Sequence, residues 1–195
     1  MKNIIFAGVG GQGVILASKI LMEVARDSGY DVKESEVHGM AQRGGSVDCH
    51  VRYGEKVYSP LISRGTADYI VSLEELEAMR KLEYLAPGGV MIVNREKINP
   101  APVETGAMEY PADIEEWLSA HVGNSEILDT KEALRKAGSK KALNIVMLGA
   151  LSKHLEFSEE TWMKAIRSLV RDKFVEMNLT AFNLGRDLKQ AVHSA

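Results

Sequence analysis

The chain of 195 residues is 45% hydrophobic, enough to bury one substantial core. Its 24 lysines and arginines against 27 aspartates and glutamates give a net charge of -3, and no basic block interleaved with aromatic residues occurs, which argues against a nucleic-acid partner. We expect no membrane association and a cytoplasmic location, because the sequence shows neither a secretory signal pattern nor an apolar run long enough to span a bilayer.

A strand, a glycine turn and a helix open the chain. Residues 3–7 form an apolar run typical of a buried strand, and residues 14–26 carry apolar side chains on nearly every side, as in a packed helix. The turn between them fits the dinucleotide pattern G-x-G-x-x-G, and its glycines let backbone N–H groups and the positive end of the helix dipole face an anion. Close packing of the helix on the sheet explains the glycines equally well. The binding candidates in this turn are Gly8, Gly10, Gly11, Gln12 and Gly13.

A second strand is predicted over residues 31–37, where apolar and polar residues alternate. A strand, a helix and a strand at this spacing predict a right-handed parallel crossover. The loops after the two strands then emerge at the same carboxyl edge of the sheet, which is the edge where open α/β folds bind ligands.

The loop after the second strand, residues 36–46, is too polar to belong to a core. An arginine beside two glycines in it predicts an anion clamp, because a guanidinium group is a rigid fork of donors and glycine lets a ligand approach the backbone; an arginine on a solvated loop is the alternative. We assign the histidine no catalytic role, because no second titratable partner is placed near it. The binding candidates in this loop are His38, Gln42, Arg43, Gly44 and Gly45.

An antiparallel hairpin is predicted from residues 47–53 and 56–59, which flank Gly54 and Glu55, so the sheet is expected to be mixed. Cys49 falls in the first of these strands, and we interpret it as a small buried residue. As the only cysteine, it excludes an intrachain disulfide and any cysteine-clustered iron-sulfur or zinc site held by this chain alone.

Strands over residues 69–73, 90–94 and 126–128 complete the predicted sheet. The helix after the first of them starts with three acidic residues, Glu74, Glu75 and Glu77, which we interpret as a solvated face favoured by the helix dipole. Residues 95–110 are expected to form a loop with at most a short strand. Further helices are predicted from residue 113, over 131–138 and 143–154, from 158, and over 173–189, the last of which has apolar surface to place on the domain or on a partner chain.

No nucleophile and base, carboxylate pair or metal cluster emerges from the spacing of the residues. An NAD-linked enzyme would need an acid at the end of the second strand, and Glu34 or Glu36 supplies one. From the residues alone, an NAD-linked enzyme and a non-catalytic anion-binding subunit are equally good interpretations.

Three stretches together resemble the gamma-type domain of the 2-oxoacid:ferredoxin oxidoreductases, and within that family the indolepyruvate type. They are the glycine turn, the loop from Glu36 to Val47, and the segment from Val57 to Ile62. The Gln42-Arg43-Gly44-Gly45 run is the most specific of them. Pro87-Gly88-Gly89 before a strand and the run over 173–178 also fit, so the resemblance covers nearly the whole chain, while residues 95–125 match nothing.

This resemblance implies one gamma-type domain over residues 1–195: a three-layer, Rossmann-like α/β domain with a mixed, mainly parallel sheet over about 1–130 and a C-terminal helical segment over about 131–195. It implies the small subunit of a complex that oxidatively decarboxylates 2-oxoacids, above all arylpyruvates such as indolepyruvate, joins the acyl group to coenzyme A and reduces ferredoxin. Thiamine diphosphate and iron-sulfur clusters then belong to a larger partner subunit. The chain itself is expected to hold no cofactor, metal or catalytic residue, and to be inactive when isolated, as a monomer or a homodimer. A stand-alone NAD-binding Rossmann-type oxidoreductase is the alternative.

Overall fold

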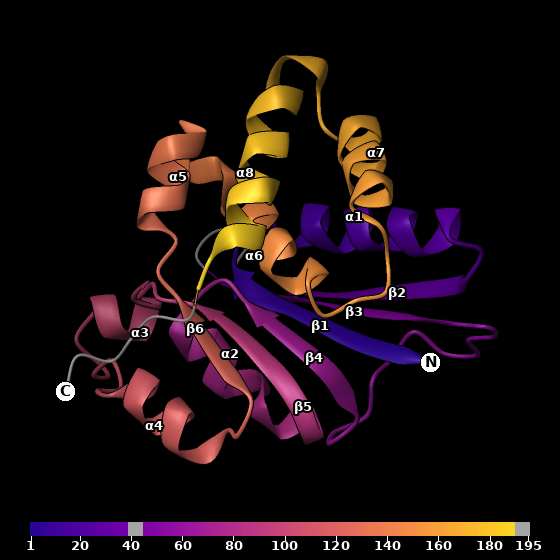
Figure 1. Ribbon diagram of the computed structural model, residues 1–195. Coiled ribbons are helices and arrows are strands. Elements are labelled where there is room, and N and C mark those ends of the chain that lie inside the picture. The colour runs from indigo at the N-terminus through magenta and orange to yellow at the C-terminus, as the bar shows by residue number, and fades with distance from the viewer. Residues whose placement is uncertain (39–44, 190–195) are drawn as a thin grey trace.

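The computed structural model describes residues 1–38 and 45–189, which form a three-layer α/β arrangement around one mixed sheet (Figure 1). The strands stand in the order β2-β3-β1-β4-β5-β6. Their bounds are β1 (Lys2–Val9), β2 (Asp31–His38), β3 (Ser46–Gly54), β4 (Ala67–Ser72), β5 (Leu85–Asn94) and β6 (Ser125–Leu128). The fold class, a mixed and mainly parallel sheet between helical layers, is therefore confirmed.

The helices follow the predicted order, with one short addition. Residues 95–110 contain the helix α3 (Ala101–Glu104) and no strand. None of the helices in the described ranges is long and apolar enough to cross a bilayer. The helices are α1 (Val14–Asp27), α2 (Glu75–Lys81), α3, α4 (Ile114–His121), α5 (Lys131–Ala137), α6 (Leu143–Ser152), α7 (Glu159–Leu169) and α8 (Val175–Asp187), with short 3-10 turns η1 (Leu82–Tyr84), η2 (Lys140–Ala142) and η3 (Asp172–Phe174).

The first crossover differs from the prediction because the two strands that it connects are not adjacent in the sheet. Strands β1 and β2 run in the same direction, but β3 lies between them and pairs antiparallel with both. Seven residues connect β2 to β3, a link short enough for a hairpin, whereas the helix α1 lets β2 skip one strand position. The carboxyl ends of β1 and β2 therefore still lie at the same edge of the sheet, as predicted.

The predicted hairpin between residues 47–53 and 56–59 is wrong in its second strand. Both edges of β3 are already occupied by β1 and β2, so residues 56–59 have no place in the ladder. Side chains hold this segment instead: the Val57 N–H donates to Asp31 Oδ2 over 2.8 Å, and Arg52 Nη1 donates to the carbonyl oxygen of Ser59 over 2.9 Å.

Two cores lie on the two faces of the sheet. Helices α1, α6, α7 and α8 cover one face of the sheet, and α2 and α4 cover the other (Figure 1). Strand β1 contributes to both cores, because Ile4 and Phe6 belong to the first and Ile5 to the second. Cys49 is fully buried in β3, as predicted.

The C-terminal helix α8 packs on the domain through glycines. A Cβ atom on Gly185 would lie 2.0 Å from the carbonyl oxygen of Val146, and one on Gly149 would lie 2.1 Å from that of Phe182. The backbones of α6 and α8 therefore touch directly, and α6 is buried along its whole length. The inner face of α8 is thus covered within the chain itself.

Candidate functional site

The carboxyl ends of β1, β4, β5 and β6 meet at one edge of the sheet. After β1 the chain crosses to the face of α1, and after β4 it crosses to the opposite face with α2. The gap between the ends of β1 and β4 is therefore the topological switch point, where open α/β sheets form a crevice for ligands. The glycine turn lies at this point.

A side chain, Gln12, fills the inside of the glycine turn. Its Oε1 accepts a hydrogen bond from the Val9 N–H over 2.8 Å, and its Nε2 donates to the carbonyl oxygen of Leu73 over 3.0 Å and to Glu96 Oε2 over 3.2 Å. A Cβ atom on Gly8 would lie 2.8 Å from Gln12 Oε1 and 2.9 Å from Val14 Cγ2, so a larger residue there would displace these side chains. Gln12 thus joins the turn to β4 and to the residues that follow β5.

The other glycines divide between backbone shape and close contact. Gly11 has a φ of 105° and Gly13 a φ of 85°, both in the left-handed region that favours glycine. Gly13 also receives a hydrogen bond on its carbonyl oxygen from Asn144 Nδ2 over 3.1 Å. Gly13 is thus in close contact with α6, whereas an added Cβ on Gly11 would meet no atom of the described residues within 4 Å.

The two loops of the predicted edge meet at Gly10 and Gly45. The Gly10 N–H donates to the carbonyl oxygen of Gly45 over 2.9 Å, so this donor serves the protein and not an anion. Beside it lies a hollow of about 290 Å³, lined by the turn, the start of α1 and Val47. Gln42, Arg43 and Gly44 lie outside the described residues, and for His38 only the backbone is described, at the end of β2 opposite Val47.

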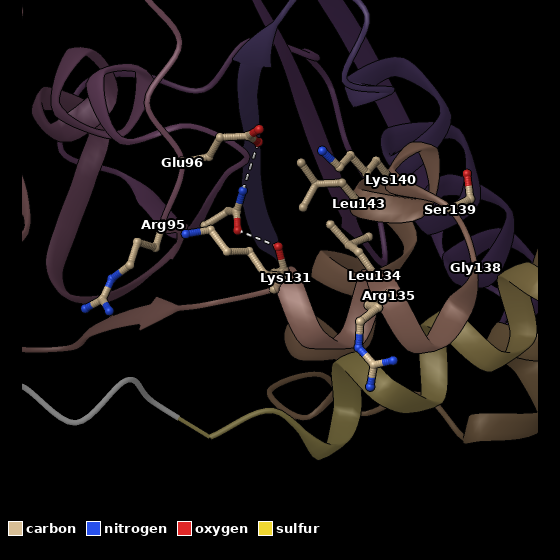
Figure 2. A pocket seen from close by; sticks show the side chains of 11 residues that line it. Arg95, Glu96, Lys131, Leu134, Arg135, Gly138, Ser139, Lys140 and Leu143 are labelled. Carbon is tan, nitrogen blue, oxygen red and sulfur yellow. Dashed lines mark hydrogen bonds between the residues drawn. The ribbon is translucent and has the colours of Figure 1, made fainter.

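A buried polar network at the ends of β5 and β6 was not predicted from the sequence. Asn94 Nδ2 donates to Glu96 Oε2 over 3.2 Å, and Asn94 Oδ1 accepts from Thr130 Oγ1 over 2.8 Å (dashed lines in Figure 2). Asn94 Nδ2 also donates to the carbonyl oxygen of Leu73 over 3.1 Å. Asn94 and Thr130 are almost fully buried. An asparagine at the end of an apolar strand was the available signal. Through Glu96 and Leu73 this network joins the glycine turn.

A pocket of about 450 Å³ opens over this network, and we call it the basic pocket. Its cationic lining is Arg95, Lys131, Arg135 and Lys140. Arg95 Nε donates to Glu115 over 2.8 Å and Arg135 Nε to Glu132 over 2.7 Å, and in Figure 2 both guanidinium groups extend away from the carboxylate of Glu96. Lys131 and Lys140 make no ion pair within the described parts of the chain. The pocket therefore offers at least two uncommitted positive charges.

The acidic start of α2 is buried, which corrects the solvated-face interpretation. Glu74, Glu75 and Glu77 are at most 2% exposed. Segments distant in sequence cover them: the Ile98 N–H and the Tyr110 hydroxyl both donate to Glu74 Oε1. Residues 95–110 fold back over α2, so the start of this helix, which the local sequence suggests is exposed to solvent, is buried.

One of these acids, Glu75, has an unpaired carboxylate oxygen. Its Oε2 is buried without a hydrogen-bond partner among the described residues, and Lys97 Nζ lies 3.7 Å away. Burial raises the pKa of Glu75 to about 7; the neighbouring Glu115 carboxylate adds to the rise, and Lys97 opposes it. Within the described residues, no group of three histidine, cysteine or acidic side chains is arranged to hold a metal ion.

The sheet, its two helical layers and the crevice at the switch point define a Rossmann-like α/β protein. A family model described as pyruvate ferredoxin/flavodoxin oxidoreductase matches residues 3–188, and the chain belongs to this family. It is similar to the indolepyruvate oxidoreductase subunit IorB of Thermococcus kodakarensis, with 39% identity over 188 residues that are 94% of this chain and 93% of the relative. The subunit of the same name from Archaeoglobus fulgidus is 39% identical over 94% of this chain and 92% of its own length.

Solved structures agree with this placement. The gamma subunit of a keto/oxoacid ferredoxin oxidoreductase from Geobacter sulfurreducens has a TM-score of 0.69 and 27% identity, over 95% of this chain and 96% of that one. The fold also recurs in the 2-oxoglutarate:ferredoxin oxidoreductase of Magnetococcus marinus, with a TM-score of 0.70 and 20% identity, where 98% of this chain matches 32% of a longer chain. The chain is thus a small subunit of a 2-oxoacid:ferredoxin oxidoreductase.

The stand-alone NAD-binding alternative gains no support from these relatives, and the geometry disfavours it. A dinucleotide fold places its ribose-binding acid on the strand beside β1, whereas here β3 occupies that position. Glu34 accepts a hydrogen bond from Ser18 Oγ of α1, and Glu36 lies 3.8 Å from Lys19 Nζ. Both acids are thus engaged with α1.

Proposed function

We propose that this chain completes a complex for the ferredoxin- and coenzyme A-dependent oxidative decarboxylation of 2-oxoacids, with arylpyruvates such as indolepyruvate as substrates. The observation that carries the substrate class is the identity of 39% to subunits named for indolepyruvate, over 94% of this chain. We further propose that residues 1–195 act as one domain, in agreement with a family match over residues 3–188.

The cofactors of the reaction belong, in this proposal, to a larger subunit that carries thiamine diphosphate and iron-sulfur clusters. The sequence supports this division, because the chain has one cysteine and a cluster takes several cysteine ligands. That cysteine, Cys49, is fully buried, and burial raises its pKa to about 12, so it stays a thiol at neutral pH.

The carboxyl edge of the sheet is proposed to face the coenzyme A path or the active-site entrance of the complex. Three features support this role: the open space beside Gly11, the predicted guanidinium clamp of Arg43, and the uncommitted lysines of the basic pocket. Gly8 and Gly10 then hold the shape of the turn. The full proposed set is Gly8, Gly10, Gly11, Gln12, Gly13, His38, Gln42, Arg43, Gly44 and Gly45.

Reconstitution with the larger subunit from the same genome tests this function. The isolated chain should reduce no ferredoxin, and the assembled complex should reduce it with indolepyruvate and coenzyme A present. Arg43→Ala should lower that activity while the matched control Arg64→Ala, an exposed arginine paired with Glu83, should not. Activity of the larger subunit alone equal to that of the complex, or calorimetric binding of NAD with a Kd near 1 μM, about -8 kcal/mol, would overturn the proposal.

A further inference from the structure

Another hollow, of about 330 Å³, lies between the start of α1, the turn η2 and the connection from α7 to α8. We call it the α7–α8 groove. Its apolar lining consists of Leu16, Leu169, Val170, Phe174 and Met177. Two of these side chains are well exposed for their type, Leu169 at 40% and Phe174 at 41%.

The two exposed apolar side chains of the groove are not needed by the core. Helix α7 buries Trp162 and Ile166 on its inner face, and α8 buries Phe182. Leu169 and Phe174 stand at the C-terminal end of α7 and just before α8, outside these contacts. Large apolar side chains gathered around a hollow mark a binding surface more often than scattered ones do.

Three cationic side chains lie at or beside the groove. Lys141 and Arg171 line it, and Lys173 Nζ lies 4.8 Å from the centre of the Phe174 ring. In the part of the chain that the structure describes, none of these three cations makes an ion pair, whereas Lys164 on α7 is paired with Asp27 at 2.8 Å. Because the whole chain carries a net charge of -3, this positive rim is a local feature and not a reflection of composition.

We propose that the α7–α8 groove receives an acidic segment of the larger subunit that carries one apolar side chain. The inference rests on the proposed function, which supplies that partner. The apolar side chain would displace water from Leu169 and Phe174, while carboxylates meet the cations of the rim. Asn144 lines the groove and also holds Gly13, so the docked segment would bring the larger subunit against the glycine turn.

The test measures the affinity of the purified small subunit for the purified larger subunit at low and at high salt. Arg171→Glu should raise the Kd by about tenfold or more and flatten its salt dependence, because it replaces an attraction by a repulsion. The matched control Lys56→Glu changes the net charge equally at an exposed site elsewhere and should leave both quantities unchanged. Equal affinity and salt dependence for Arg171→Glu and the unmodified chain would overturn the proposal.

A photo-crosslinking residue in place of Leu169 identifies the occupant. The expected product joins this chain to a peptide of the larger subunit that is rich in aspartate and glutamate. A product that joins two copies of this chain, a peptide without acidic residues, or no product with the larger subunit would overturn the inference. If ferredoxin reduction is reconstituted while these results fail, the groove alone is misassigned; if the unmodified chain forms no complex, the proposed function fails first.

Discussion

Replacing Glu75 by glutamine tests the buried acid cluster at the start of α2. Glutamine keeps the shape of the side chain and removes its ionisation, and its amide can donate to the neighbouring Glu115 carboxylate. The titratable and charged groups that act on Glu75 are Glu74 on α2, Glu115 on α4, and Lys97 from the segment after β5. The change therefore removes the titration of Glu75 and leaves these neighbouring groups in place.

The magnitude follows from the pKa of Glu75, which rises from 4.5 to about 7 on folding. The folded chain then binds a proton that the unfolded chain releases, so stability falls as the pH rises from 4.5 to about 7 and is level above that. Each pH unit between the two pKa values corresponds to about 1.4 kcal/mol, which gives a loss of about 3 kcal/mol. For a chain of this size that is roughly 6 to 12 °C in Tm.

Calorimetric melting of the chain between pH 4 and pH 8.5 is the assay. Glu75→Gln should match the unmodified chain near pH 4 and exceed its Tm near pH 8, because only the unmodified chain must ionise the carboxyl group at position 75. The control Glu132→Gln alters an exposed acid paired with Arg135 and should give the same dependence of Tm on pH as the unmodified chain. Parallel Tm curves for Glu75→Gln and the unmodified chain would refute the buried-proton reasoning.

Three further outcomes are expected. Gly185→Ala should destabilise the chain by about 3 kcal/mol or more in urea unfolding, because its Cβ would lie 2.0 Å from the carbonyl oxygen of Val146, while Gly123→Ala, which meets nothing within 4 Å, should change little. Gln12→Ala should cost about 1 to 3 kcal/mol in the same assay, since it leaves polar groups of the turn unpaired; no change would remove Gln12 from its bridging role. Lys140→Ala should raise the KM for coenzyme A in the reconstituted complex without changing the Tm, and an unchanged KM would contradict the proposed use of the basic pocket.

Local signals predicted the start of the chain correctly. The apolar run of β1, the glycines and the packed helix α1 depend on neighbouring residues only, so periodicity and turn chemistry suffice. The place of β3 depended on pairing between distant segments. The alternation of residues 47–53 predicts a strand whatever its neighbours are. It does not indicate that β1 and β2 pair with both edges of that strand.

The candidate site shows the same division. The glycine turn and the loop with Arg43 were found from residue types and from the family resemblance. The network of Asn94, Glu96 and Thr130 was not, because its members are brought together only when β5 and β6 align in parallel. The acids of α2 were misread for the same reason: Tyr110 covers Glu74 from 36 positions away in the sequence.

The position of β3 between two strands of the opposite direction constrains how the segment before it can vary. A strand with one neighbour can slide by a residue and repair its pairing, but β3 would have to break register with β1 and β2 together, and each slip would turn Val51 and Cys49 away from their core. An insertion or deletion between Gly39 and Gly45 is therefore compatible with the fold only if the register of β3, from Ser46 onward, stays unchanged. The register of β3 is therefore held from both of its edges at once.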